Sequence, residues 1–444
     1  MQTSDEHKPA PVHDESAPQD AGVEGGQVDR RGFLRCMSWA GTGMLWSLQG
    51  GVPRASLLGD HQGDAAGLFF VQISDSHIGF SKAANADVTA TMRTAVASIN
   101  ALPVQPSFLL HTGDITQLNR VSEFDTADQV LAEARVRDVF FVPGEHDVAT
   151  DNGATYLARY GTRAPRGVNG GGWYSFDHTG VHFIGLVNVL NLQAGGLGTL
   201  GADQLDWLAK DVKHLSASTP LVVFAHVPLW TVYPRWGWGT DDGARALALL
   251  KRFGSVTVLN GHIHQTMQKV EGNVSFHTAM STAFPQPRPG TAPAPGPLLV
   301  GADRLRDVLG ITSVRYVRGN RHLAVVDETL SGASPSEALA EGEAAARAAA
   351  PSGIAGAPVP VREGEIAIDN FAFTPRTLTV ARGRAVSWVN HDDVPHRIQS
   401  ANGVFTPSAV LDTHGTFALT LSKAGEYPYF CSLHPTMTGK IVVR

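Results

Sequence analysis

Five short segments of this sequence carry side chains that bind metal ions, and each follows a run of apolar residues. They are Asp75-Ser76-His77, Gly113-Asp114, Gly144-Glu145-His146-Asp147, His226 and Gly261-His262-Ile263-His264. An Asp and a His two residues apart can face one cation, and two histidines spaced as Gly-His-x-His can serve two neighbouring cations. Asp114 can bridge such a pair, while the glycines allow a close backbone approach. The set predicts a site for two divalent metals, for which Mn, Fe and Zn all suit His and carboxylate ligands.

A second group of metal-binding side chains lies near the C-terminus. Cys431, His434 and Met437 share one short loop, and His396 follows an apolar strand pattern further upstream. Two imidazoles, one thiolate and a weak thioether form the trigonal ligand set with a distant axial ligand that suits one copper ion. This combination predicts a copper site. A buried free cysteine with incidental histidines is the alternative interpretation.

The first group requires a sheet that brings its members together. Apolar runs that read as buried strands are Leu68–Ile73, Ser107–Leu110, Val139–Val142, His182–Val187, Leu221–Ala225 and Val256–Leu259. They alternate with amphipathic helical patterns, which predicts a layered α/β fold over residues 66–328. Ligand sites of such folds lie at the carboxyl ends of strands, where the metal-type residues occur here.

The second group requires a different scaffold. Residues 329–362 are rich in Ala, Pro and Gly, with a helical run around 335–350, and read as a linker. From residue 363 to 444 the pattern changes to short alternating strands, including 377–380, 385–389 and 440–443. This predicts a small all-β sandwich with a Greek-key topology.

The N-terminal 60 residues indicate export. Residues 1–28 are polar and acidic and are expected to be disordered. Arg30-Arg31 precedes an uncharged stretch, Cys36 to Leu48, that resembles a twin-arginine signal and is too short for a stable transmembrane segment. We therefore expect a periplasmic or otherwise exported protein. A short buried helix after a chance arginine pair is the alternative, and signal cleavage stays open.

Composition narrows the functional class. The formal charge of −6, without a concentrated basic stripe, argues against nucleic-acid binding. The two cysteines, Cys36 and Cys431, fall in the predicted signal and in the copper loop, so we expect no internal disulfide in the mature chain.

The first group, in its order along the chain, resembles the calcineurin-like metallophosphoesterases over roughly residues 68–326. The resemblance implies one metal held by Asp75, His77, Asp114 and His264, and a second held by Asp114, Glu145, His226 and His262. It further implies a catalytic His146, steadied by Asp147, that approaches the leaving-group oxygen during hydrolysis of a phosphate ester. Two such cations activate a water and neutralise phosphate charge.

One position departs from the family pattern. Glu145 stands where the family usually has Asn, and a carboxylate adds negative charge that reduces the Lewis acidity of the cations. Either Glu145 displaces the second metal, or it binds well and changes the metal preference. No tyrosine follows Asp114 closely, unlike in purple acid phosphatases, and the run His111 to Ile115 is more similar to the bacterial cyclic-nucleotide phosphodiesterase branch.

The sequence leaves open the roles of one histidine and one aromatic segment near the first group. His111 is either a structural residue or a partner of the metal ligands. The aromatic segment from Trp230 to Trp238 either roofs the site or forms a plain packed loop.

Residues 363–444 resemble the amicyanin and plastocyanin type of cupredoxin. The resemblance implies that His396, Cys431, His434 and Met437 bind copper, and we expect Asn390 to brace the cysteine loop. The sequence thus predicts an exported metal-dependent phosphoester hydrolase, a phosphodiesterase or phosphomonoesterase, with an appended copper domain for electron transfer with a periplasmic redox partner or for regulation. The alternative is a non-enzymatic copper-binding or electron-transfer protein whose phosphoesterase domain is degenerate.

Overall fold

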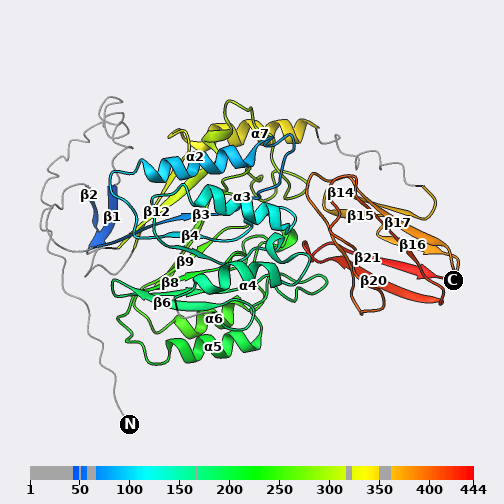
Figure 1. Ribbon diagram of the computed structural model, residues 1–444, viewed down its shortest axis with the longest axis horizontal. Helices are drawn as coiled ribbons and strands as arrows, with labels where there is room; N and C mark the ends of the chain where they lie inside the picture. The colour runs from blue at the N-terminus through cyan, green and yellow to red at the C-terminus, as the bar shows by residue number, and fades with distance from the viewer. Residues whose placement is uncertain (1–43, 50–51, 58–66, 166–167, 317–322, 350–361) are drawn as a thin grey trace, which may run out of the picture. The chain divides into compact units, whose positions relative to one another are not determined.

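The computed structural model describes residues 44–49, 52–57, 67–165, 168–316, 323–349 and 362–444 (Figure 1). The chain divides into the units Met1–Gly63 and Asp64–Arg444. In the first unit, β1 (Met44–Gln49) and β2 (Val52–Leu57) pair as an antiparallel hairpin. The arginine pair and most of the predicted signal lie outside the described residues, so the signal stays a prediction. Among the described helices, none has the length and hydropathy needed to cross a membrane.

The α/β domain contains two sheets. Their strand orders are β13-β12-β3-β4-β5 and β10-β11-β9-β8-β7-β6. The strands are β3 (Leu68–Ile73), β4 (Leu109–His111), β5 (Val139–Phe141), β6 (Tyr174–His178), β7 (Val181–Gly185), β8 (Leu221–Phe224), β9 (Val256–Asn260), β10 (Gln268–Glu271), β11 (Val274–Thr278), β12 (Gly310–Tyr316) and β13 (Ala324–Thr329). The six predicted strands are confirmed within two residues at each end.

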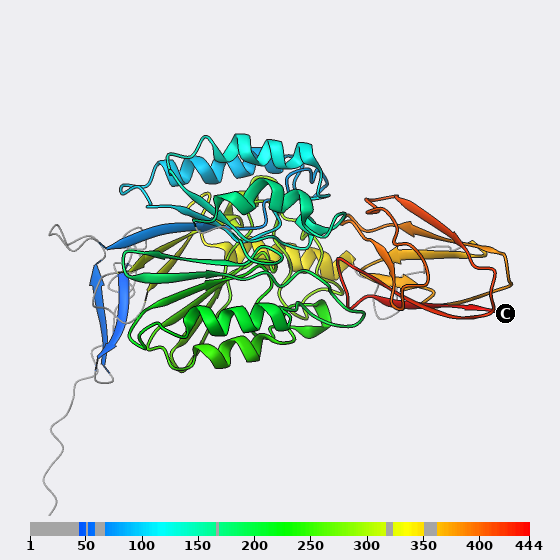
Figure 2. The ribbon, with the colours of Figure 1, turned by 60° about the horizontal axis from the view of Figure 1, so that its bottom comes forward.

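Helices cover the outer face of each sheet (Figure 2). The described helices of the domain are α2 (Val88–Asn100), α3 (Val121–Leu131), α4 (Ala154–Tyr160), α5 (Ala202–Val212), α6 (Gly243–Leu250) and α7 (Pro335–Ala349), with short 3-10 helices η1 (His146–Val148), η2 (Gly161–Arg163), η3 (Pro234–Trp236) and η4 (Leu305–Asp307). One apolar cluster joins α2 and α3 to the five-stranded sheet, and another joins α5 and α6 to the six-stranded sheet.

Strand β3 shows why these layers form. Its residues Phe69 and Val71 belong to the cluster under α2 and α3, whereas Phe70 belongs to the cluster between the sheets. Successive side chains of a strand point to opposite faces, so an apolar run is buried on both sides. Between the sheets, the Phe70 ring stacks on Phe108 at 5.0 Å and meets Phe183 edge-on at 5.4 Å. The two sheets are therefore joined by a dry aromatic core.

One buried polar group ties the six-stranded sheet to α5. The ring of His182, in β7, is 3% exposed and lies between two carboxylates. Its Nδ1 is 2.7 Å from Asp177 and its Nε2 is 2.9 Å from Asp211. Burial lowers the pKa of His182, but the hydrogen bonds and charges of Asp211 and Asp177 outweigh it, so the pKa is raised.

The segment predicted as a linker contains α7. The carboxylate of Glu343 in this helix is fully buried and forms a bidentate pair with Arg288. This half of the segment therefore packs against the α/β domain. Residues 350–361 lie outside the described residues.

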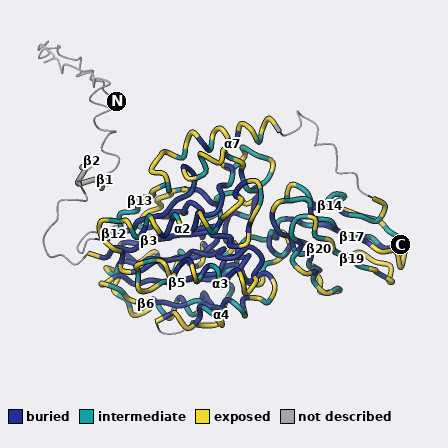
Figure 3. Tube along the Cα trace, turned by 45° about the horizontal axis from the view of Figure 1, so that its top comes forward, coloured by how far each residue is buried: buried dark blue, intermediate teal, exposed yellow. Residues whose placement is uncertain are grey.

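The β domain is a sandwich of two four-stranded sheets, β15-β14-β17-β19 and β16-β21-β20-β18. The strands are β14 (Glu365–Asp369), β15 (Ala372–Thr374), β16 (Thr377–Val380), β17 (Ala385–Asn390), β18 (Ile398–Ser400), β19 (Thr416–Thr420), β20 (Gly425–Cys431) and β21 (Thr438–Val443). Trp388 and Tyr429 fill its core, and Figure 3 shows the buried interior of both domains. The predicted fold class, a layered α/β domain plus a small all-β domain, is confirmed.

Candidate metal centres

The predicted metal ligands of the α/β domain gather at one edge of its two sheets. Strands β3, β4 and β5 run parallel, as do β7, β8 and β9, so the carboxyl ends within each set point the same way. Asp75 and His77 follow β3, Asp114 follows β4, Glu145 follows β5, His226 follows β8, and His262 and His264 follow β9. These seven residues are called the dinuclear site below.

The backbone of this edge is strained. Five of the seven residues have positive φ angles in the left-handed region: Asp75 (53°), His77 (42°), Asp114 (49°), His262 (70°) and His264 (53°). This conformation costs an L-residue roughly 1–2 kcal/mol. Strain of this kind clusters at functional sites, where the surrounding fold holds it in place.

The first group of ligands brings two imidazoles face to face. His77 directs Nδ1 to the Gln117 side-chain oxygen at 2.8 Å, and His264 directs Nδ1 to the Phe284 carbonyl at 2.6 Å. Both Nδ1 atoms therefore donate, which leaves a lone pair on each Nε2. These two Nε2 atoms lie only 3.1 Å apart, and Asp75 Oδ1 lies 3.3 Å from His264 Nε2. Converging lone pairs repel one another unless a cation lies between them, so the group fits a metal.

The second group contains Glu145. His226 donates Nδ1–H to the Thr112 carbonyl at 2.7 Å, and its Nε2 lies 3.1 Å from Glu145 Oε2. Among the described residues neither of these buried atoms has a hydrogen-bond partner, and the other Glu145 oxygen lies 3.0 Å from His262 Nδ1. Buried polar atoms rarely lack a partner, so this arrangement also fits a bound cation. The position of the carboxylate between both histidines favours Glu145 as a ligand over Glu145 as an obstruction.

Asp114 connects the two groups. Its Oδ2 lies 3.6 Å from His77 Nε2 in the first group and 3.3 Å from His226 Nε2 in the second. Its Oδ1 accepts the backbone N–H of His146 at 3.0 Å. One carboxylate oxygen thus faces both groups, as expected of a bridging ligand.

His146 and Asp147 differ in their contacts from our expectation. His146 Nδ1 lies 2.8 Å from the Gln117 carbonyl, and this contact orients the ring. Asp147 does not steady it. Its carboxylate instead accepts the backbone N–H groups of Ile115, Thr116 and Gly144 at 2.9 to 3.1 Å. Asp147 therefore fastens the loop after β4 to the loop after β5.

Charges within the dinuclear site set the protonation of its members. Burial lowers the pKa of His77 to about 3, which keeps the ring in the neutral form that binds metals. Burial would raise the pKa of Glu145, but the charges of His262 and His226 outweigh it and hold the pKa well below its usual value. Burial and the charge of Asp114 raise the pKa of Asp147 to about 7. His77 and Glu145 are thus in their metal-binding forms near neutral pH. Burial would lower the pKa of His226, but the charges of Asp114 and Glu145 outweigh it and raise the pKa well above its usual value, so this ring must lose a proton when it binds a cation.

The residues that orient the ligands were not identified from the sequence. Gln117 holds both His77 and His146, and its position three residues after Asp114 was the available signal. His111 Nε2 contacts the Ser76 hydroxyl at 2.9 Å, between the ligands Asp75 and His77. His111 therefore supports the segment that carries Asp75 and His77. Of the two roles that the sequence left open, this contact favours that of a structural residue.

The aromatic segment also has a defined place. Trp236 and Trp238 line a cavity together with Asp114, His146 and His262, and both rings are at least nine-tenths buried. They pack edge to face at 5.1 Å. The segment therefore forms a wall of the dinuclear site.

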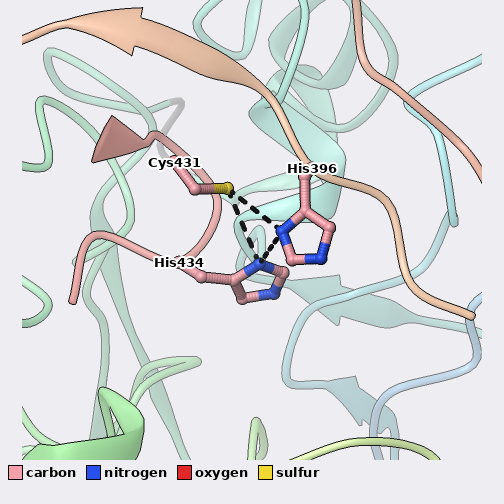
Figure 4. A group of neighbouring side chains, drawn as sticks. All are labelled: His396, Cys431 and His434. Carbon is pink, nitrogen blue, oxygen red and sulfur yellow. Dashed lines mark hydrogen bonds between the residues drawn. The ribbon is translucent and has the colours of Figure 1, made fainter. Parts of the chain in front are cut away.

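Three of the four predicted copper ligands of the β domain, His396, Cys431 and His434, converge (Figure 4). Cys431, the last residue of β20, places Sγ 3.5 Å from His396 Nδ1 and 3.7 Å from His434 Nδ1. The two Nδ1 atoms are 3.3 Å apart. Met437 is buried in the same loop, where its carbonyl accepts the Cys431 N–H at 3.0 Å. Two nitrogens and a thiolate at the corners of a small triangle fit copper.

A buried carboxylate orients the copper ligands. Asp392 Oδ2 lies 2.8 Å from His396 Nε2, which directs Nδ1 toward Cys431. Burial would raise the pKa of the Cys431 thiol, but His396 and His434 outweigh it and hold the pKa well below its usual value. Asn390 was expected to brace the cysteine loop. It instead donates to the carbonyls of Val394 and Leu411, so it braces the loop that carries His396.

Comparisons with known proteins agree with both sites. Residues 70–266 match the family model of the calcineurin-like phosphoesterases, and residues 350–443 match that of the cupredoxin-like domains. The amicyanin of Paracoccus denitrificans is 33% identical over 111 residues, which cover 24% of this chain and 85% of that protein. The chain therefore belongs, through its β domain, to the cupredoxins, and it carries a calcineurin-like phosphoesterase domain before it.

Two further relatives each match one of the two domains. The amicyanin of Paracoccus versutus is 31% identical over 95 residues, covering 20% of this chain and 72% of that protein. A 3',5'-cyclic-nucleotide phosphodiesterase of Nostoc is 26% identical over 223 residues, covering 48% of this chain and 77% of that protein. At the family level the first domain is that of a metal-dependent hydrolase, and the second is that of a copper protein.

Proposed function

We propose that this protein hydrolyses phosphodiesters at the dinuclear site and that its β domain carries one copper ion. One observation carries the proposal: Asp114 joins two groups of buried histidines and carboxylates. In the first group two imidazole nitrogens lie 3.1 Å apart, and in the second group Glu145 Oε2 and His226 Nε2 have no hydrogen-bond partner among the described residues. Two bound cations would supply Lewis acidity and a water of lowered pKa. The chain's own residues hold these cations and position the substrate beside them.

His146 is the residue that we assign to the leaving group. Its ring is 4% exposed and lies 4.8 Å, edge to face, from the ring of His77. Because Nδ1 donates to the Gln117 carbonyl, the charged form of the ring carries its second proton on Nε2, which can pass it to the departing oxygen. Burial lowers the pKa of His146, but the charges of Asp114 and Glu145 outweigh it and raise the pKa, which favours this charged form. Trp236 and Trp238 exclude water and offer flat surfaces to a base or aryl group.

The substrate class and location complete the proposal. The name of the Nostoc relative and the aromatic wall favour a cyclic nucleotide over a phosphomonoester. The segment with Arg30-Arg31 favours export through the twin-arginine pathway, so that copper would be acquired outside the cytoplasm. A periplasmic redox partner is then accessible to the copper domain.

The experiment compares bound metals and hydrolysis of bis-p-nitrophenyl phosphate among four proteins. These are the wild type, His146→Ala, Glu145→Asn and the control His214→Ala, which removes an exposed histidine outside both sites. We expect two divalent metals in each and a loss of hydrolysis of at least about 100-fold in His146→Ala alone, as for other positioned acids. Activity in His146→Ala equal to that of the control would refute the assignment.

A second function follows from Glu145. If its charge suppresses hydrolysis, the protein is a copper-binding or electron-transfer protein with a degenerate phosphoesterase domain. Hydrolysis by Glu145→Asn but not by the wild type would support that function. Hydrolysis by the wild type would exclude it. The intense visible absorption of a copper–thiolate bond, lost in Cys431→Ser, tests the copper assignment independently.

A further inference from the structure

The cavity beside the dinuclear site has walls from both domains. From the α/β domain it is lined by five of the metal ligands, by His146 and by the two tryptophans described above. From the β domain it is lined by Phe371, Val394 and the copper ligand His434. Its volume is about 30 Å³. A copper ligand thus forms part of the wall of the dinuclear site.

Four contacts hold the β domain at this position. The His434 ring lies 6.4 Å, edge to face, from that of His146. The N–H of Gly195 donates to the carbonyl of Pro435 at 2.6 Å, and Lys82 Nζ lies 3.6 Å from Asp412 Oδ1. Ala149 of the α/β domain packs among the core residues of the β domain. The contacts come from three separate segments of the α/β domain and not from a single point.

The size of the cavity excludes the substrate. Pockets that hold small organic ligands measure roughly 300–1,000 Å³. A volume of about 30 Å³ has room for no more than a few water molecules. A cyclic nucleotide, or any phosphodiester, cannot reach the metal ligands while His434 and its neighbours stay in place.

We infer that the β domain, through its copper-binding loop of residues 431–437, is a lid over the dinuclear site that must move away before a phosphodiester binds. The inference rests on the proposed function for the identity of the substrate. The contacts suit a lid, because an ion pair between half-exposed groups contributes little and one backbone hydrogen bond is readily exchanged for water. The protein thus carries its own inhibitor of the hydrolytic site.

Locking the lid provides the first test. In a Cys36→Ser background, Lys82→Cys and Asp412→Cys are joined by a short bis-maleimide, while Cys431 is protected by bound copper and full burial. Each single-cysteine protein, capped with a mono-maleimide, is the control. We expect the cross-linked protein to lose at least tenfold in kcat/KM for bis-p-nitrophenyl phosphate. We also expect pyridine-2,6-dicarboxylate to extract its divalent metals at least tenfold more slowly.

Opening the lid provides the second test. Ala149→Arg places a long charged side chain against the β domain without altering a metal ligand, and Lys82→Glu, which reverses one charge at the edge, serves if Ala149→Arg fails to fold. The control is Arg93→Glu, which breaks a 2.9 Å ion pair with Glu133 inside the α/β domain. We expect several-fold faster metal extraction and faster hydrogen exchange at the Gly195 amide than in the control.

The outcomes separate the lid from the proposed function. The lid would be overturned if metals were extracted equally fast from the cross-linked and the capped proteins. It would also be overturned if the Gly195 amide of the wild type exchanged as fast as an amide in a solvated loop. Absence of hydrolysis in every open and closed form would count against the proposed function. In that case extraction and exchange rates still decide whether the loop covers the site.

Discussion

Gln117 offers the sharpest test of how the dinuclear site is built. Its side-chain oxygen accepts the Nδ1–H of His77 at 2.8 Å, which turns the His77 Nε2 lone pair toward the first metal. In Gln117→Met this acceptor is lost at nearly constant volume, while the backbone carbonyl that holds His146 remains. Loss of such an orienting partner weakens metal binding by roughly 10–100-fold, or about 1.4–2.8 kcal/mol.

The assay is competition for Zn or Mn between the protein and a fluorescent chelator of known affinity. The control is Gln204→Met, which removes a buried glutamine that donates to the Val187 and Leu200 carbonyls, away from the ligands. We expect both variants to be less stable and only Gln117→Met to bind one of its two metals more weakly. Equal affinities in the two variants would refute the argument that the converging lone pairs are set by Gln117.

Three further predictions concern other parts of the molecule. The pKa of His182 is raised in the folded state, so its contribution to stability is complete below about pH 6.5 and is lost as the pH rises through the folded pKa. The melting temperature of the wild type should therefore fall as the pH rises through this range. The melting temperature of His182→Gln should change less with pH. Asp392→Ala should weaken copper binding roughly 10–100-fold, because His396 loses its hydrogen-bond acceptor; a copper titration followed by visible absorption measures this, and unchanged affinity would contradict it. Phe224→Ala, in the fully buried aromatic core, should lower the free energy of unfolding by about 3–5 kcal/mol in urea denaturation, and a loss under 1 kcal/mol would contradict the packing described.

Much of the fold follows from the sequence because its strands are buried on both faces. Leu68–Ile73 is an apolar run interrupted only by Gln72, and the structure reproduces its bounds without change. The metal ligands were recognisable for a related reason: polar residues such as Asp75 and His226 directly after an apolar run have no role in the core. Copper ligands were recognisable because Cys431 and His434 share one loop.

Other features depend on distances that a linear pattern does not contain. Asp147 adjoins His146 in sequence, yet its carboxylate turns away to the loop after β4. Asn390 lies upstream of both copper loops, and only the fold selects the loop that it braces. The approach of His434 to His146 joins residues almost three hundred positions apart. Contacts of this kind depend on how sheets and domains pack, and periodicity carries no information on them.

The left-handed backbone conformation of five residues in the dinuclear site has a consequence for protein engineering. Glycine adopts positive φ angles without strain, and asparagine does so at low cost, so either residue at His77 or His262 would relieve a penalty of roughly 1–2 kcal/mol. A directed-evolution experiment that selects for heat resistance alone would therefore enrich replacements that remove imidazoles from this edge. Thermostable variants from such a library would be metal-poor, and a second selection for metal retention would be needed to keep the site intact.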